Sequence, residues 1–309
     1  MTKIATREAY GKALAQLGAE DERIVVLDAD LSGSTKTALF AKEFPHRFFN
    51  IGIAEADMMG AAAGLAAAGK VPFASTFAIF AAGRCYDQIR TSIAYPNLNV
   101  KIAATHAGLT VGEDGATHQM NEDIALMRAL PNLTVLVPAD APEAAAMTRW
   151  AAEHQGPVYL RLGRAAVPTV NGEDYQLQPG RAQVLRDGDD LVIFACGYMV
   201  HQALEAAADL ADRGISAAVV NVHTIKPLDA ETVVKYARRC GAVVTAEEHS
   251  IIGGLGGAIA EVLGEEHPTP LVRIGVRDTF GESGKPGELL EKYGLTAKEI
   301  IEAGLKLKK

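Results

Sequence analysis

The sequence predicts an α/β protein built from two consecutive three-layer domains with mostly parallel sheets. Short apolar runs alternate along the chain with longer stretches of helical periodicity, which is typical of a parallel sheet covered by helices. A length of 309 residues is enough for two domains of ordinary size. The alternation is interrupted at AAVPTVNGEDYQLQPG (165–180), which is rich in turn-forming residues and has no sustained period. We therefore predict domains at 1–166 and 185–309, joined by a linker at 167–184.

The first domain contains the larger number of predicted elements. Apolar runs that are bounded by polar or turn-forming residues predict strands at 23–30, 48–53, 71–76, 99–105, 133–139 and 157–162. The clearest helical periodicity between these runs predicts helices at 55–69, 86–95, 121–130 and 141–154. Strands that alternate with helices in this way favour parallel pairing.

The second domain repeats the alternation on a smaller scale. Its predicted strands are 190–197, 215–222, 241–247 and 270–276, and its predicted helices are 201–214 and two that begin near Asp229 and Gly256. The segment GGLGG (253–257) lacks both the GxGxxG spacing and a following GKS or GKT. It therefore predicts a turn and a helix start and not a phosphate loop.

Composition excludes several classes of protein. The net charge is −8 with no run of five like charges, which argues against nucleic acid or an anionic membrane as the main partner. No apolar stretch approaches the roughly 20 residues that span a bilayer, and the beginning of the chain has no apolar signal core. The 3 cysteines are far apart and form no CxxC, so neither a disulfide framework nor a zinc site is indicated. We expect a cytoplasmic protein.

Polar and aromatic side chains follow the predicted strands of the first domain. In open parallel sheets, ligands bind at the carboxyl ends of the strands. The residues at or just beyond these ends are Asp28, Asp30, Glu55, Phe77, Phe80, His106, Arg161 and Arg164. Their accumulation at one edge of the sheet predicts a binding site there.

Taken singly, some of these residues have ordinary explanations. Glu55 lies in the first turn of a predicted helix, where a surface glutamate stabilises the helix dipole. Phe77 and Phe80 are three residues apart, a spacing that is more typical of core packing than of a stacking platform.

The loop after the fourth predicted strand is dense in polar groups. His106 and His118 share it with Glu113 and Asp114, which indicates the wall of a polar pocket, although their spacing does not indicate a metal site. Arginine and serine bind phosphate well, but scattered arginines are also typical of solvated surface. The candidates for such a role come from four distant segments: Arg7, Ser34, His106 and Arg164.

Four segments resemble transketolases. RFFNIGIAEADMMGAAAGLA (47–66) is similar to the segment that carries their cofactor-binding glutamate, and STFAIFAAGRCYDQIR (75–90) resembles the stretch that supplies aromatic residues to the same ring. The segment THAGLTVGEDGATHQMNEDIALMRALPNLTVLVPAD (105–140) is similar to their substrate loop, and YLRLGR (159–164) to the end of their pyrimidine-binding domain. The resemblance continues through the linker and implies a thiamine-diphosphate pyrimidine-binding domain followed by a transketolase C-terminal domain.

The resemblance also implies roles for individual residues. The catalytic residues would be Glu55, which contacts the aminopyrimidine of thiamine diphosphate, together with His118 and His106. The cofactor-binding residues would be Glu55, Phe77, Phe80, Asp30 and His118. The substrate-binding residues would be Arg7, Ser34, His106, Asp114 and Arg164, and no metal ligand is expected in this chain. The reaction implied is transfer of a two-carbon ketol unit between sugar phosphates, as in the pentose phosphate pathway.

Transketolases bind the diphosphate and a divalent metal through a GDG motif that an asparagine follows some thirty residues later. No segment of this sequence has that motif in a first βα unit. We therefore expect a separate N-terminal subunit that carries the diphosphate-binding domain and binds Mg²⁺ or Ca²⁺. An α2β2 assembly, in which this chain also self-associates as a homodimer, is implied.

Three alternatives remain open at this point. The β subunit of a 2-oxoacid dehydrogenase shares the two-domain layout, but the VGEDGATHQ loop (111–119) favours sugar chemistry. Deoxyxylulose-phosphate synthase shares part of that loop but carries its diphosphate domain on the same chain. The third alternative is a noncatalytic, transketolase-like regulatory subunit, against which the presence of Glu55 and the polar loop argues. The donor and acceptor sugars are left open.

Overall fold

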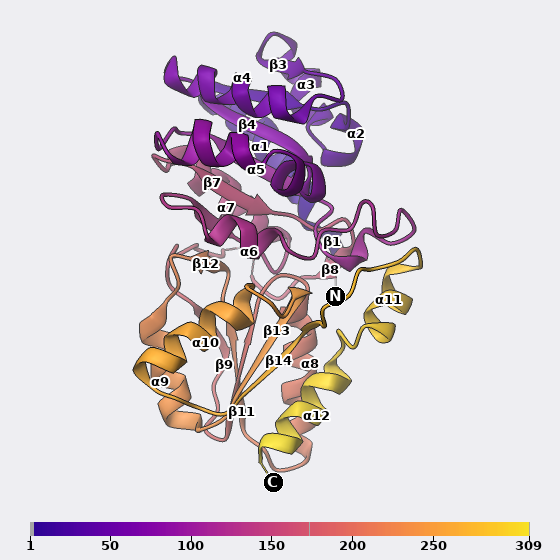
Figure 1. Cartoon of the computed structure of the whole chain (residues 1–309), viewed down its shortest axis with the longest axis vertical. Coiled ribbons are helices and arrows are strands. Elements are labelled where there is room, and N and C mark those ends of the chain that lie inside the picture. Colours follow the sequence, from indigo (N-terminus) through magenta and orange to yellow (C-terminus); the bar gives the residue numbers. More distant parts are fainter. Residues whose placement is uncertain (1–2, 173, 309) are drawn as a thin grey trace.

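The computed structural model describes residues 3–172 and 174–308 and contains two α/β domains stacked end to end (Figure 1). Residues 1, 2, 173 and 309, which the predicted domain and linker ranges include, lie outside the described part. The predicted fold class is confirmed, because both domains contain a mostly parallel sheet covered by helices.

The sheet of the first domain has seven strands in the order β12-β6-β7-β5-β4-β2-β3. Their bounds are β2 (Ile24–Asp28), β3 (Phe48–Asn50), β4 (Val71–Phe77), β5 (Lys101–Thr105), β6 (Thr134–Leu136), β7 (Val158–Arg161) and β12 (Thr224–Lys226). All neighbours pair in parallel except β12, which is antiparallel to β6. The parallel direction places the carboxyl ends of β2, β4, β5 and β7 at one edge of the sheet.

Helices cover both faces of this sheet. They are α1 (Thr6–Glu20), α2 (Ser32–Thr35), α3 (Ala38–Glu43), α4 (Glu55–Ala67), α5 (Tyr86–Gln88), α6 (Asp123–Arg128) and α7 (Ala141–Glu153). Shorter turns are the 3₁₀ segments η1 (Pro45–Arg47) and η4 (Leu109–Val111) and the π-helical segments η2 (Ile79–Arg84) and η3 (Ile89–Ala94).

Alternation along β2 shows how the layers form. Ile24 and Val26 belong to a buried cluster with residues of α1 and α7, whereas Val25 and Leu27 belong to a cluster with residues of α4. Successive side chains of a strand point to opposite faces, so a strand between two helical layers is apolar at every position. This explains why the strand could be recognised from the continuous run IVVL.

The second domain is built around a five-stranded sheet in the order β14-β13-β10-β11-β9. Its strands are β9 (Gln183–Arg186), β10 (Leu191–Ala195), β11 (Ala217–Asn221), β13 (Val243–Ser250) and β14 (Leu271–Val276). Its helices are α8 (Met199–Asp212), α9 (Ala230–Cys240), α10 (Leu255–Glu266), α11 (Pro286–Lys292) and α12 (Ala297–Leu307). In the described part of the chain, no helix is both long and apolar enough to cross a membrane.

Four short strands are absent from the prediction. β1 (Lys3–Ala5) pairs antiparallel with β8 (Ala166–Pro168), β9 is antiparallel to β11, and β12 joins the sheet of the first domain. β8 and β9 overlap the two ends of the predicted linker at 167–184. Strands of three or four residues are too short to show a period in the sequence, and their partners are distant along the chain.

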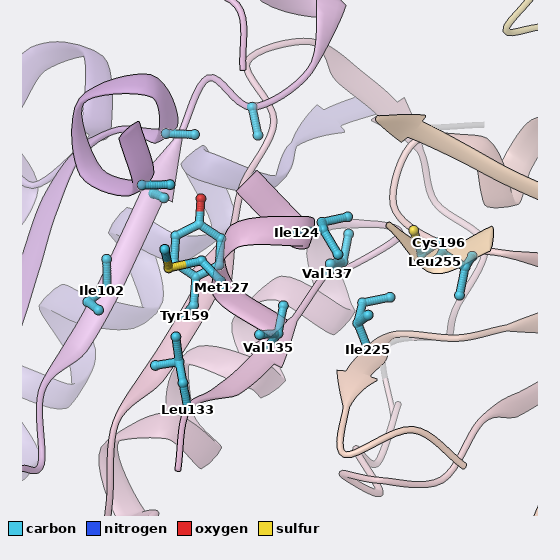
Figure 2. Packing of buried hydrophobic residues seen from close by; sticks show 14 of the residues in the cluster. Ile102, Ile124, Met127, Leu133, Val135, Val137, Tyr159, Cys196, Ile225 and Leu255 are labelled. Atoms are coloured by element: carbon cyan, nitrogen blue, oxygen red, sulfur yellow. The ribbon is translucent and has the colours of Figure 1, made fainter. Parts of the chain in front are cut away.

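The two domains share buried apolar surface. Figure 2 shows Ile124 and Val137 of the first domain in one cluster with Cys196, Ile225 and Leu255, which come from the second half of the chain. All five side chains are buried. Because this core is continuous between the domains, the loops at the domain junction are held by residues of both.

Candidate active site

Four aromatic rings gather beyond the carboxyl ends of β4 and β5. Phe77 ends β4, and its ring stacks on His106 with 3.7 Å between the ring centroids. Phe80, one turn later, lies parallel to Phe77 at 5.9 Å and meets His118 edge-on at 5.6 Å. The structure therefore brings these four predicted residues together, and the buried Phe77 contacts the other three rings.

His106 is held in one orientation and one charge state. Its backbone has φ = 56°, and its ring nitrogens lie 3.2 Å from Arg7 Nη1 and 2.9 Å from Thr105 Oγ1. Arginine can only donate, so Nε2 accepts from Arg7 and Nδ1 carries the proton. Burial, followed by the charges of Arg7 and Arg164, lowers the pKa of His106 to about 3. At neutral pH this imidazole is therefore uncharged.

A buried aspartate shapes the loop on the other side of Arg7. Asp28 accepts hydrogen bonds from the Leu31 N–H at 2.6 Å, from Thr35 Oγ1 at 2.7 Å and from Thr37 Oγ1 at 2.9 Å. These bonds order the segment that carries Ser34, whose carbonyl oxygen accepts from Arg7 Nη1 at 2.8 Å. Burial raises the pKa of the Asp28 carboxyl, and the hydrogen bonds oppose that rise.

A second arginine, Arg164, lies close enough to Arg7 to lower its pKa. Burial lowers the pKa of Arg7, and the charge of Arg164 lowers it further. Arg164 Nη1 also lies 3.4 Å from Glu113 Oε2 and 3.7 Å from Asp114 Oδ2, at the rim of the loop. Two guanidinium groups that repel each other beside a neutral histidine favour the binding of an anion between them.

Glu55 is the first residue of α4, and its side chain is only 2% exposed. Its Oε2 accepts a hydrogen bond from Arg84 Nη1 at 2.7 Å, and the Arg84 guanidinium lies 4.5 Å from the centroid of the Phe80 ring. A flat, nitrogen-rich group thus stacks on Phe80 and bonds Glu55 at the same time. The aminopyrimidine of thiamine diphosphate is also flat and nitrogen-rich, so the residues present fit that ring.

Not every predicted residue joins this group. Asp30 is exposed, with φ = 62°, and its N–H donates to Asn50 Oδ1 at 3.1 Å. No contact among the described residues links Asp30 to the aromatic rings. Arg161, which also follows a strand end, turns inward and pairs with buried Asp123 at 2.8 Å.

Sequence reasoning missed Arg84 and gave Asp28 no individual role, although both organise the site. Arg84 is absent from the predicted site, although it ends η2, a π-helical turn of a kind that is frequent at functional sites. Asp28 is predicted only to lie at a strand end, although a carboxylate after four apolar strand residues is a signal of a buried, hydrogen-bonded group.

Comparisons with known proteins show the family of this chain. Residues 2–169 match the family described as transketolase, pyrimidine binding domain, and residues 180–300 match transketolase, C-terminal domain. A Methanocaldococcus jannaschii protein named as a transketolase C-terminal section is 53% identical, over 95% of this chain and 93% of its own length. A Clostridium 6-deoxy-6-sulfo-D-fructose transketolase subunit is 48% identical, over 96% and 92%.

Two further relatives extend the comparison. One of the subunits of the apulose-4-phosphate transketolase of Phocaeicola vulgatus is 38% identical, over 99% of this chain and 98% of its own length. A solved structure described as a split gene transketolase, inactive beta4 tetramer, is 61% identical with a TM-score of 0.93, and the match covers 99% of this chain and 98% of that one. The chain therefore belongs to the transketolase family, of which it comprises the pyrimidine-binding and C-terminal domains, homologous to the C-terminal section of split transketolases.

Proposed function

We propose that this chain is the subunit of a two-subunit, thiamine-diphosphate-dependent transketolase that provides the pyrimidine pocket and the sugar site. The enzyme would move a two-carbon ketol unit from a ketose phosphate to an aldose phosphate. The observation that carries the proposal is that Glu55 and Phe80 lie close enough for one flat group, the guanidinium of Arg84, to contact both. When bound, the cofactor would supply the electron sink that this carbon–carbon chemistry requires.

Each residue of the pocket would have a defined task toward the cofactor. Glu55 would hold a proton at a ring nitrogen of the pyrimidine, a task that suits a carboxylate almost closed off from water. Phe77 and Phe80 would orient the ring by stacking and exclude water from it. His118 is half-buried beside Phe80 and would contact both cofactor and substrate, and the exposed Asp30 would contact the cofactor from the loop after β2.

The sugar would lie on the histidine and arginine side of the pocket. His106, which is uncharged, would bind a sugar hydroxyl through a hydrogen bond, and His118 would transfer protons. Arg7, Arg164 and the segment around Ser34 would bind the phosphate. Asp114 is exposed at the rim, within reach of a sugar hydroxyl, and would favour one configuration of that hydroxyl.

The diphosphate group and its Mg²⁺ or Ca²⁺ would be bound by an N-terminal subunit in an α2β2 assembly. Two relatives are named as subunits, which supports the existence of such a partner. The tetramer of the 61% identical relative is described as inactive, which supports self-association of this chain without catalysis. Relatives named for a sulfo-sugar and for apulose 4-phosphate make both sugars candidate substrates beside pentose phosphates.

Reconstitution tests the proposal directly. The purified chain would be mixed with the diphosphate-binding transketolase subunit of the same source, thiamine diphosphate and Mg²⁺. Ketol transfer from xylulose 5-phosphate to ribose 5-phosphate would then be measured, with 6-deoxy-6-sulfofructose and apulose 4-phosphate as alternative donors. We expect transfer in the mixture and none with either subunit alone. Activity of the single chain, or no activity with any donor, would contradict the proposal.

Replacing Arg164 with alanine should mainly raise the KM for phosphorylated sugars. The guanidinium would bind the phosphate, away from the bond that is broken, so about tenfold in KM is expected with a smaller change in kcat. Arg149 is a matched control, because it is 40% exposed against 35% for Arg164 and also pairs with a carboxylate. An unchanged KM in Arg164→Ala, or an equal rise in Arg149→Ala, would remove Arg164 from the phosphate site.

Replacing Arg84 with methionine should tighten the binding of thiamine diphosphate to the assembled enzyme. The guanidinium occupies the face of Phe80 and bonds Glu55, so it must move when a pyrimidine ring takes that place. A several-fold lower Kd is expected by calorimetry, since displacing the half-exposed Arg84 from its ion pair costs about 1 kcal/mol. The exposed Arg90, on η3, serves as the control. A higher Kd in Arg84→Met would contradict this prediction and show that the guanidinium stabilises the bound cofactor.

A further inference from the structure

A glutamate of the second domain reaches the substrate loop of the first. Glu248, near the end of β13, is 5% exposed, and its Oε1 accepts a hydrogen bond from the Thr110 N–H at 2.6 Å. Thr110 lies four residues after His106, in the 3₁₀ segment η4. Gly108 has φ = 80°, and a Cβ on it would lie 2.3 Å from Glu248 Oε1. The carboxylate is therefore pressed against the backbone of the loop, which only glycine permits at this position.

The far end of the same loop, residues 106–121, is also attached to the second domain. The Ser250 N–H donates to the Asn121 carbonyl oxygen at 2.6 Å, and Gln119 Nε2 donates to the Glu282 carbonyl oxygen at 2.9 Å. Helix α11, which lies near the domain junction in Figure 1, packs against η4, a part of this loop. His118 thus lies directly before the attachments at Gln119 and Asn121, and His106 lies four residues before the attachment at Thr110.

The backbone of Glu248 is itself fixed from the first domain. Arg161 Nη2 donates to the Glu248 carbonyl oxygen at 2.9 Å, while Arg161 Nε donates to Asp123 Oδ2 at 2.8 Å. All three residues are buried in the region where the two domains share their core. A cavity of ≈ 20 Å³ beside Glu248, Thr110 and Arg161 has room for little more than one water molecule. The carboxylate consequently has almost no freedom to leave Thr110.

From these contacts we propose that Glu248 is a positioning residue, through which the second domain sets the conformation of the sugar-binding loop. The expected effect on sugar binding rests on the proposed function. The expected effect on the conformation of the loop does not. Glu248 acts on Gly108 and Thr110, and these determine where His106 and the segment leading to His118 lie. It does not touch the Glu55–Phe80 side of the pocket in any described contact. Its removal should therefore affect sugar binding and leave cofactor binding unchanged.

Hydrogen–deuterium exchange on the full chain alone tests the structural part, whether or not the transketolase assay succeeds. In Glu248→Ala, the loop peptide that contains Thr110 should exchange about tenfold faster or more, because its amide loses its carboxyl acceptor. In Glu248→Gln, which keeps an acceptor oxygen, the same peptide should exchange at an intermediate rate. This variant tests the proposal even if the alanine variant does not fold.

Glu247→Ala is the matched control. Glu247 is an equally buried neighbour, but its carboxylate accepts from the Leu255 and Gly256 N–H groups at the start of α10, inside the second domain. Its loss should speed exchange in α10 and lower Tm without affecting the loop. Equal loosening of residues 106–121 in Glu247→Ala and Glu248→Ala, or no loosening in Glu248→Ala, would overturn the proposal.

Kinetics of the reconstituted enzyme test the functional part. In Glu248→Ala we expect the KM for the sugar phosphates to rise about tenfold, with the Kd of thiamine diphosphate unchanged, and partial recovery in Glu248→Gln. A loose loop with unchanged sugar KM would overturn the link to substrate binding. An inactive wild-type mixture would instead contradict the proposed function, and the exchange result would still decide the structural claim.

Discussion

Replacing Glu55 with alanine is expected to lower kcat of the assembled enzyme by about 10²–10⁴-fold, the usual contribution of a positioned acid or base. The side chain is almost fully buried at the start of α4. It accepts a hydrogen bond from Arg84, whose guanidinium lies over the ring of Phe80. Among the described residues, no other carboxylate shares this contact with Arg84. The measurement is kcat in the reconstituted ketol-transfer assay at saturating cofactor.

The chain should remain folded in this variant. Arg84, which loses its partner, has a side chain that is 49% exposed and can be solvated by water. Asp57→Ala is the matched control, because Asp57 lies in the same first turn of α4, is exposed, and makes the same kind of helix-dipole contribution. Near-normal activity of Glu55→Ala, or an equal loss in Asp57→Ala with an unchanged circular dichroism spectrum in both, would exclude Glu55 from catalysis.

Much of the fold was predictable because parallel strands between two helical layers are apolar at every position. The run at β10 has this character throughout, and the run at β2 has it up to its last residue, Asp28, so both strands could be placed from the sequence. β12 could not be placed, since its three residues belong to the second half of the chain and complete the sheet of the first. Its position depends on the core that the two domains share, which cannot be predicted from a local sequence pattern.

The structure brings together several of the predicted site residues, but the contacts among them could not be predicted from the sequence. Residues at the carboxyl ends of β4 and β5 had to approach one another, and Phe77 and His106 do. The charge state of His106 was not predictable, because it depends on burial and on Arg7, which lies 99 residues away in the chain. The same limit applies to Glu248, whose contact with Thr110 joins residues 138 apart.

Replacing Arg161 with methionine should destabilise the chain by about 3–5 kcal/mol, the usual cost of leaving one partner of a buried ion pair alone. Asp123 is fully buried and would keep the Tyr159 hydroxyl, which donates to its Oδ2 at 2.9 Å. Urea unfolding followed by circular dichroism measures the loss. It also measures the double variant Arg161→Met/Asp123→Leu, which should recover much of the stability because neither charge of the pair is then left buried alone.

The comparison with an exposed pair separates burial from charge in this prediction. Arg239 pairs with Asp187 and Asp189 at distances of 2.8 and 2.5 Å, as short as those of Arg161, but at the surface. Water can solvate those carboxylates when the arginine is removed, so Arg239→Met should leave the unfolding midpoint almost unchanged. Equal losses in the two single variants would mean that the cost comes from the side-chain packing of arginine and not from an uncompensated buried charge. If the double variant recovered nothing, the junction between the domains would depend on the ion pair itself, and Asp123 and Arg161 would then stabilise the substrate loop together with Glu248.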